Sequence, residues 1–184
     1  QDSWLEFWKD AWMINNQNHI LFKEDSLLIE DFVAIQRDRR AVLSSYATRG
    51  ITLNLINLDF AGLNPQLKYK PLQFGGKFDL DIRTADILEL SSIHLDLKAD
   101  SLLINDDDWG SLDVISQMDN LEQPIVAFAS LTRDTSQLLV DALYNFRQTG
   151  EAENQQKGFF DIDLSIQSFP MWFAEYFIGG TISN

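Results

Sequence analysis

The 184-residue sequence contains no cysteine and only two histidines, His19 and His94. The absence of cysteine excludes disulfide frameworks, thiolate nucleophiles and cysteine-based zinc sites. A histidine metal centre or a serine–histidine dyad would have to be built on one of the two histidines. His94 lies on the polar side of an alternating stretch, where an exposed sheet histidine is the simpler interpretation. The sequence therefore offers little of the usual chemistry of an active site.

Basic residues and long apolar runs are also scarce. The 14 lysines and arginines stand against 28 aspartates and glutamates, which gives a net charge of −14. This balance argues against nucleic acid as a partner, because binding driven by counterion release needs clustered positive charge. It also disfavours attraction to an anionic membrane surface. No apolar run approaches the roughly 18 residues of a membrane span, and no basic, cleavable leader opens the sequence, although a segment of a longer protein would lack both.

The sequence does contain a clear alternation of apolar and polar residues with a period of two. Successive side chains of a strand point to opposite faces, so each alternating stretch predicts one apolar face and one wet, mostly acidic face. The clearest stretches are 51–55, 77–83, 93–100 and 161–167. Further strands are expected at about 19–23, 27–36, 41–48, 109–118, 124–132 and 137–146. The sequence therefore predicts an all-β chain of about ten to twelve strands.

Three segments depart from this alternation. Trp4, Trp8 and Trp12 recur every four residues, and this spacing favours a helix at the start of the sequence, although a strand would also place them on one face. Residues 170–178 begin with a proline and end at a glycine pair, which is typical of a short helix. Residues 148–158 are almost wholly polar and are expected to form a solvated loop.

The sequence contains an internal repeat whose two copies align without gaps. Residues 53–67 (LNLINLDFAGLNPQL) align with residues 164–178 (LSIQSFPMWFAEYFI), and each copy begins as an alternating strand and then becomes a short apolar turn or one-turn helix. Such repeats indicate stacked units that share one core. We interpret the chain, 1–184, as a single segment of a repetitive protein, with units at about 19–147 and 159–184, the second of them truncated. A chance match of two amphipathic strands is the alternative.

No motif indicates catalysis, a resident metal or a cofactor. Gly75-Gly76-Lys77 lacks the spacing of a phosphate-binding loop and predicts a β-bulge or a hairpin entry. The run 105–108 (NDDD) lacks the ligand spacing of a calcium loop, so a plain acidic turn is preferred to a calcium site. Asp79/Asp81 and Asp161/Asp163 each share a sheet face, but acid–base catalysis would need one carboxylate in a desolvated pocket. We therefore expect no enzyme, no catalytic residues and no metal site.

The order of these motifs resembles a known family. The strand ITLNLINLDF leads into GLNPQL and then FGGKFDLDI, the upstream stretch ILFKEDSLLIEDFVAIQRDRRAVLSSYATRG has a similar strand–turn–strand character, and FFDIDLSIQSFPMWFAEYFIGGTISN looks like a second module. Together they resemble the AsmA-like superfamily, and within it the TamB-like translocation and assembly module proteins of bacterial envelopes. The resemblance covers about 19–83 and 159–184.

The resemblance implies a fold, a place and a function. It implies a long, curved, incompletely closed antiparallel or mixed β-sheet with short helical turns, whose apolar groove crosses the periplasm. It further implies an inner-membrane anchor outside this chain, phospholipid acyl chains as partners, and a TamA-like outer-membrane partner of the Omp85 type. Carriage of phospholipid between the membranes and assistance to outer-membrane protein assembly are the implied functions.

The expected groove lining is the apolar half of the alternating strands. These residues are Leu53, Leu55, Phe78, Leu80, Ile82, Ile93, Leu95, Leu97, Leu112, Val114, Ile162, Leu164 and Ile166. For any one of them, membership of a dry core is the alternative. The alternative for the whole chain is a closed β-sandwich that acts as a binding or adhesion module for a glycan or a protein ligand. In that case Trp109 and Trp172 would be exposed stacking platforms.

Overall fold

The computed structural model describes residues 3–7, 10–46, 48–66, 72–89, 91–120, 122–145 and 158–168. Within these ranges, eleven strands form one antiparallel sheet, and β3 and β4 form a separate two-stranded sheet. The large sheet follows the order β1-β2-β5-β6-β7-β8-β9-β10-β11-β12-β13, so apart from the β3–β4 excursion every strand pairs with its neighbours along the chain. The strands are β1 (Ser3–Phe7), β2 (Asp10–Ile14), β3 (His19–Lys23), β4 (Ser26–Glu30), β5 (Phe32–Gln36), β6 (Arg39–Tyr46), β7 (Gly50–Asp59), β8 (Phe74–Asp86), β9 (Ser91–Ile104), β10 (Asp107–Met118), β11 (Ile125–Arg133), β12 (Ser136–Asn145) and β13 (Phe159–Gln167).

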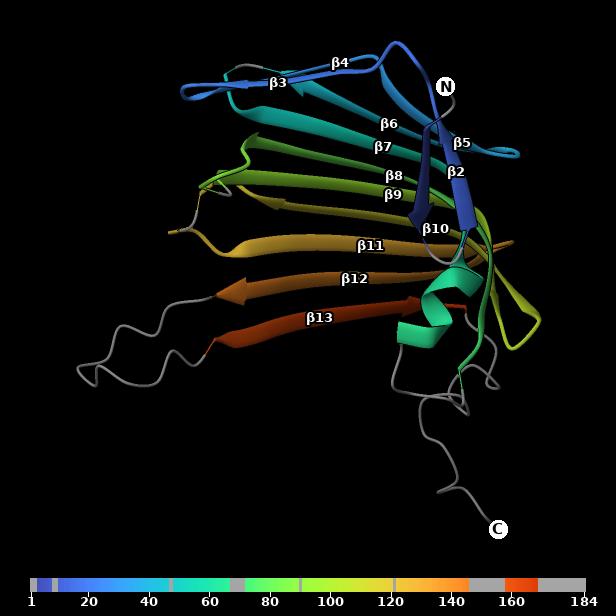
Figure 1. Cartoon of the computed structure of the whole chain (residues 1–184). Coiled ribbons are helices and arrows are strands. Elements are labelled where there is room, and N and C mark those ends of the chain that lie inside the picture. The colour runs from blue at the N-terminus through green and yellow to red at the C-terminus, as the bar shows by residue number, and fades with distance from the viewer. Residues whose placement is uncertain are drawn as a thin grey trace.

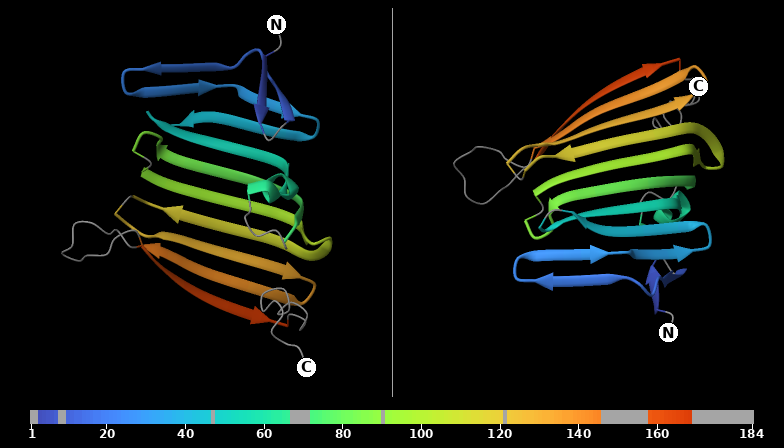
Figure 2. Two further views of the ribbon diagram at one scale, coloured as in Figure 1. Left: turned by 60° about the horizontal axis from the view of Figure 1, so that its bottom comes forward. Right: turned by 90° about the horizontal axis from the view of Figure 1, so that it is seen from above.

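The large sheet is open and curved. Figures 1 and 2 show its strands side by side in chain order, with β1 and β13 at opposite ends of the sheet. The two end strands do not pair with each other, and the sheet is not closed into a barrel. The predicted all-β, incompletely closed sheet is thus confirmed, and the pairings within it are antiparallel rather than mixed. The closed sandwich of the alternative interpretation is not found among the described residues.

The register of the strands places apolar side chains in continuous rows on one face, which we call the apolar face. One row follows consecutive strand partners from β5 to β13 without a polar residue. Its members are Ala34, Ala41, Leu55, Leu80, Leu97, Val114, Ala129, Val140 and Leu164. Because the side-chain period of a strand is two, the residues between them point to the opposite face, which we call the polar face.

Two irregularities keep the apolar face continuous. In β7 the register with β8 shifts between Leu55 and Leu58, and Asn57 there has a φ of 64°. Leu55 pairs with Leu80 and Leu58 pairs with Phe78, so the bulge returns Leu58 to the apolar face. The register between β8 and β9 shifts between Lys77 and Asp79, where β9 carries one extra residue, so the bulge lies beyond the glycine pair at which it was predicted.

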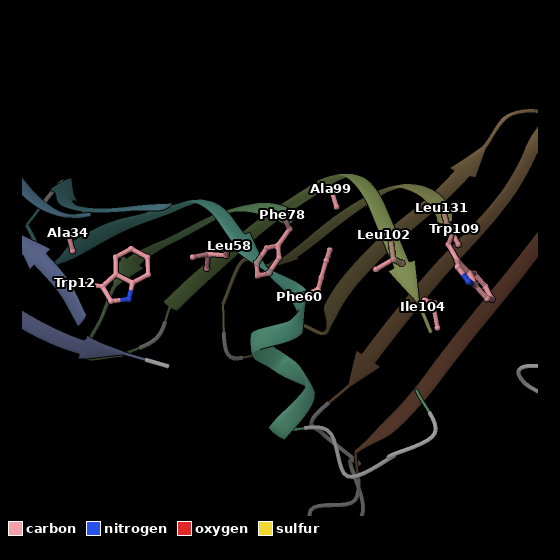
Figure 3. Packing of buried hydrophobic residues seen from close by; sticks show 10 residues of the cluster. All are labelled: Trp12, Ala34, Leu58, Phe60, Phe78, Ala99, Leu102, Ile104, Trp109 and Leu131. Carbon is pink, nitrogen blue, oxygen red and sulfur yellow. The ribbon is translucent and has the colours of Figure 1, made fainter. Parts of the chain in front are cut away.

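The short helix η1 (Phe60–Gln66) follows β7 directly and covers part of the apolar face. The Phe60 ring packs against the Phe78 ring, with 4.5 Å between their centroids. The side chain of Asn64 donates to the carbonyl of Phe74 and accepts from its N–H, both at 2.8 Å. This pair of hydrogen bonds ties η1 to the first residue of β8. Figure 3 shows the buried residues gathered on the inner side of the arched sheet, where η1 also lies.

The two copies of the repeat share an unusual backbone conformation. Asn57 and Ser168, which occupy equivalent positions, have φ values of 64° and 59°, although neither is glycine. Leu53 and Leu164, also equivalent, both lie on the apolar face. The predicted one-turn helix of the first copy is η1, whereas its counterpart at 170–178 lies outside the described residues, as does most of the predicted loop at 148–158.

Two sequence-based predictions of secondary structure are wrong. The predicted helix around the tryptophans is a hairpin of β1 and β2, in which Leu5 pairs with Trp12 and Trp4 pairs with Met13. Trp4 and Trp12 therefore face opposite sides, with 63% and 3% of their surfaces exposed, and Trp8 lies outside the described residues. The single strand expected at 27–36 is two strands, β4 and β5, because Asp31 adopts a φ of 52° and turns the chain between them.

Candidate ligand-binding face

All thirteen residues predicted to line a groove lie on the apolar face. Leu53, Ile82 and Leu95 are consecutive partners in one row, and Leu55, Leu80, Leu97, Val114 and Leu164 belong to the row described above. The remaining five lie on the same face, further along these rows or in adjacent rows: Phe78, Ile93, Leu112, Ile162 and Ile166. The structure thus brings the whole predicted set onto one surface, and its contact with lipid stays a prediction.

Coverage of the apolar face changes along the sheet. Near the centre, η1 and the neighbouring side chains bury Leu58 and Phe78, which are 1% and 4% exposed. At the β13 end no described segment covers the face, and Ile162, Leu164 and Ile166 are 60%, 57% and 51% exposed. A contiguous apolar surface of this kind is typical of an interaction site rather than of scattered surface leucines.

The β1 end of the sheet is built differently. Figure 1 shows the β1–β2 hairpin turned away from the direction of the other strands, and it pairs with β5 only through Met13 and Ile14. The hairpin and the sheet enclose a cavity of about 180 Å³ on the apolar face, which we call the hairpin cavity. Its lining is wholly apolar and comes from five strands: Leu5, Trp12, Phe32, Ala34, Ala41, Leu43, Leu53, Leu55 and Leu58. The hairpin therefore forms an end wall to the apolar face.

An ion-pair cluster fastens this end wall to the sheet. Arg39, the first residue of β6, donates from Nη1 to Asp10 Oδ2 at 2.7 Å and from Nη2 to Asp59. Asp10 begins β2 and Asp59 ends β7, so one guanidinium joins the hairpin to two strands of the sheet. The two carboxylates balance the charge of Arg39 at the ends of the strands. The lining of the hairpin cavity contains no charged residue.

The polar face carries the acidic residues that the alternation predicted. Asp81 accepts from Arg83 Nε at 2.7 Å, and Asp96 accepts from Lys98 Nζ at 3.1 Å. A shallow hollow of about 460 Å³ lies over these strands, and its lining combines apolar side chains with Arg40, Asn54, Asp79, Asp81, Asp96 and Lys98. The lining thus carries charges of both signs, of which Asp96 and Lys98 pair with each other.

The predicted acidic turn occupies the connection between β9 and β10. Asn105 and Asp106 have φ values of 52° and 68°, and Asp108 Oδ1 accepts from the N–H of Gly110 at 2.9 Å. Asp108 is thus engaged in shaping the turn. Within the described ranges, no group of three or more histidines, aspartates or glutamates is placed to hold a metal ion.

Trp109 corrects one part of the alternative interpretation. It is 1% exposed and belongs to the buried cluster, so it is not the exposed stacking platform that a glycan-binding module would use. A register shift between Asp108 and Gly110 inserts Trp109 as an extra residue in β10, and a simple alternation does not anticipate this. Trp172 lies outside the described residues.

Sequence reasoning also missed Trp12 as a site residue. It was expected on a helix, whereas the hairpin places it against Ala34 and Leu58 in the hairpin cavity (Figure 3). The role of Trp12 could have been found by considering two short antiparallel strands, in which the apolar residues Leu5 and Trp12 pair on one face.

Comparisons with known proteins give no relative. A scan against family models, a search of curated proteins and a search of solved structures all find no match to the chain. In the part of the chain that the structure describes, no helix has the length and apolar character needed to cross a membrane.

Proposed function

We propose that this chain is a segment of a TamB-like envelope bridge whose apolar face binds phospholipid acyl chains. In the full protein this face carries phospholipid between the inner and outer membranes, assists outer-membrane protein assembly, or does both. The observation that carries the proposal is the uninterrupted row of apolar residues from Ala34 to Leu164, on an open sheet whose β13 end is covered by no described segment. A sheet with one apolar face must cover that face, and here much of it has no second layer from the described residues.

The dimensions of the apolar face suit an acyl chain. Strands lie about 4.8 Å apart, so the nine strands from β5 to β13 extend roughly 38 Å across the sheet. One leaflet of a bilayer core is about 15 Å thick, half of about 30 Å, so the face is longer than one chain. Burial of each methylene group is worth about 0.8 kcal/mol. Because the apolar rows along the sheet are similar, an acyl chain could shift along them without meeting one site of much higher affinity.

The setting of the proposal comes from the family resemblance. It places the chain in the periplasm, with an inner-membrane anchor outside this sequence and a TamA-like, Omp85-type partner at the outer membrane. It assigns no enzymatic reaction and no cofactor. The acidic polar face would keep such a segment soluble and would disfavour wrong strand pairing.

A second candidate is the binding of polypeptide. Among the described residues, the outer edge of β13 pairs with no other strand and lies beside exposed apolar side chains, and an extended peptide can add to such an edge. This observation favours chaperoning of outer-membrane β-strands, or binding of another protein ligand, over the glycan-binding alternative.

Photo-crosslinking distinguishes these candidates. A diazirine amino acid is placed at Leu95 on the apolar face or at Asp96 on the polar face, and the protein is incubated with vesicles of phosphatidylethanolamine and phosphatidylglycerol. We expect phospholipid attached at position 95 and not at position 96, by intact-mass spectrometry. Crosslinking in cells, in the full-length parent, extends the test to polypeptide. Lipid at neither position, or equally at both, would overturn the proposal, and polypeptide alone at position 95 would favour the second candidate.

A further inference from the structure

The polar face carries one row of residues that is largely apolar. Trp4 pairs with Met13, Met13 with Ile35, Ile35 with Arg40, and Arg40 with Ile56, so these five residues form a continuous line across β1, β2, β5, β6 and β7. We call this line the exposed row. The side chains of Trp4, Met13, Ile35 and Ile56 are 63%, 44%, 41% and 38% exposed. Large apolar side chains that are exposed next to one another, rather than scattered singly, are typical of an interaction site.

The fold does not need apolar side chains in the exposed row. The neighbouring residues Trp12 and Ala34 point to the apolar face and are 3% and 2% exposed, so they supply the buried side of the same strands. The solvent side of a half-buried antiparallel sheet is ordinarily polar. Exposed tryptophan, methionine and isoleucine on this side therefore contribute little to the core and point to contact with another molecule.

Arg40 is the charged member of the exposed row, and it forms no ion pair with another described residue. The carboxylates that line the adjoining hollow already have partners. Asp81 and Asp96 pair with basic residues of their own strands, and Asp79 accepts from a backbone N–H at 2.8 Å. Arg40 thus presents an exposed positive charge between two isoleucines, and its complement is a carboxylate with apolar groups on either side.

The composition of the exposed row fits a protein partner. Tryptophan, methionine and arginine are enriched in protein–protein interfaces, and tryptophan and arginine are frequent among the residues that dominate binding. Tryptophan and arginine also suit a membrane surface. The net charge of −14 and the three carboxylates that line the adjoining hollow disfavour an anionic bilayer, however.

The length of the exposed row suits one polypeptide segment. Its five strands are consecutive in the sheet and lie about 4.8 Å apart, so the row is roughly 19 Å long. About six residues of extended chain or about thirteen residues of helix cover this distance. A single short segment can therefore contact all five positions.

We propose that the exposed row docks a segment of a partner protein, whose apolar side chains cover Trp4, Met13 and Ile35 and whose carboxylate pairs with Arg40. The hollow of about 460 Å³ adjoins the row at Arg40 and Ile56 and gives the partner a recess beside this ion pair. The docking surface lies on the polar face, opposite the face assigned to acyl chains. It goes beyond the proposed function, and either assignment can fail without the other.

Site-specific photo-crosslinking of the full-length parent in cells tests the docking surface. A diazirine amino acid replaces Ile35 in the exposed row or, as the matched control, Ile115, which lies on the polar face in β10 and is 42% exposed against 41% for Ile35. The attached product is identified by mass spectrometry, and an attached peptide is sequenced. The experiment is repeated in Arg40→Glu and in Arg40→Lys, which keeps the charge.

We expect one polypeptide attached at position 35 and absent at position 115, with aspartate or glutamate beside apolar residues in the attached peptide. Arg40→Glu should lower the yield at least about tenfold, because it places like charges together, whereas Arg40→Lys should keep the yield within about threefold. Replacement of the partner's carboxylate by lysine should restore the crosslink in Arg40→Glu. Because this rescue depends on the charge of the partner, it distinguishes a lost contact from a lost fold.

Several results would overturn the docking surface. They are the absence of polypeptide at position 35, equal labelling at positions 35 and 115, an unchanged yield in Arg40→Glu, and the absence of rescue by the reversed charge. Phospholipid attached at position 35 would indicate a membrane contact instead, and a second copy of this chain would indicate self-association, so each would also overturn it. Lipid binding by the apolar face is measured separately at position 95.

Discussion

A charge placed at the exposed β13 end of the apolar face should block ligand binding with little loss of stability. Leu164 on β13 suits this test because 57% of its surface is exposed, so only the remaining 43% already contributes to the fold. Full burial of a leucine side chain is worth about 1.5–3 kcal/mol. A ligand that covers the exposed part therefore gains about 0.9–1.7 kcal/mol, which corresponds to roughly fourfold to eighteenfold in affinity.

Leu164→Asp should weaken binding by at least about tenfold, because it removes this gain and forces a carboxylate out of water. Ser165→Asp is the matched control, since it adds the same charge one residue along the same exposed strand but on the polar face. We expect binding of a pyrene-labelled phospholipid, followed by fluorescence, to stay within twofold of wild type in Ser165→Asp. Urea unfolding checks that both variants fold. Equal losses in the two variants, or wild-type affinity in a folded Leu164→Asp, would refute the assignment of the apolar face as the ligand site.

Three further predictions concern the sheet itself. Gly76→Ala should lower the free energy of unfolding by at least about 1–3 kcal/mol in urea titrations, because Gly76 has a φ of 92° and an added Cβ would lie 2.0 Å from the Ser101 carbonyl oxygen; an unchanged midpoint would contradict this. Asp163→Lys should stabilise the fold by about 0.2–1 kcal/mol, since Asp163 lies directly opposite Asp141 in the register, and the gain should shrink at high salt. The hydrogen bond from Lys77 holds the pKa of the Asp38 carboxyl below its ordinary value, so Lys77→Met should raise that pKa in an NMR titration. Because the pKa of Asp38 is lower in the folded state than in the unfolded state, the pair stabilises the fold above the unfolded-state pKa, and this stabilisation is lost as the pH falls through the folded-state pKa. Lys77→Met should therefore diminish the loss of stability in acid.

The sequence was sufficient to assign the two faces of the clearly alternating strands. The alternation in 77–83 and 93–100 is unambiguous, and a one-residue slip would move every leucine to the polar face, so the register was strongly specified. The fold class and the position of η1 after β7 followed from the same local signals. These features depend on residues close together in the sequence, which is why pattern reasoning reached them.

The errors arose where the local pattern was ambiguous. A spacing of four between tryptophans fits both a helix and a strand, and only the pairing of Leu5 with Trp12 decides for a hairpin. Asp31 turns the chain at a positive φ without glycine or proline, so the boundary between β4 and β5 carried no obvious signal. Trp109 sits at a bulge, where counting by twos gives the wrong face.

The hairpin cavity could not be predicted for a different reason. It exists because the β1–β2 hairpin turns over the sheet and brings Leu5 near Leu58, two residues that are distant in the sequence. The cluster of Arg39, Asp10 and Asp59 that fastens the hairpin likewise joins three separate strands. No periodic pattern encodes such a long-range arrangement, and a structure is needed to find it.

The strictly sequential order of β5 to β13 has a consequence for how the molecule opens. Among the described residues, each interior strand of this series is held by two neighbouring strands, whereas β13 pairs with β12 alone. In such nearest-neighbour architectures, local unfolding of an end strand costs less free energy than local unfolding of a central strand. Amide hydrogens of β13 should therefore exchange with solvent before those of β8 and β9, so the edge where the apolar face is most accessible is also the part of the sheet that opens most readily.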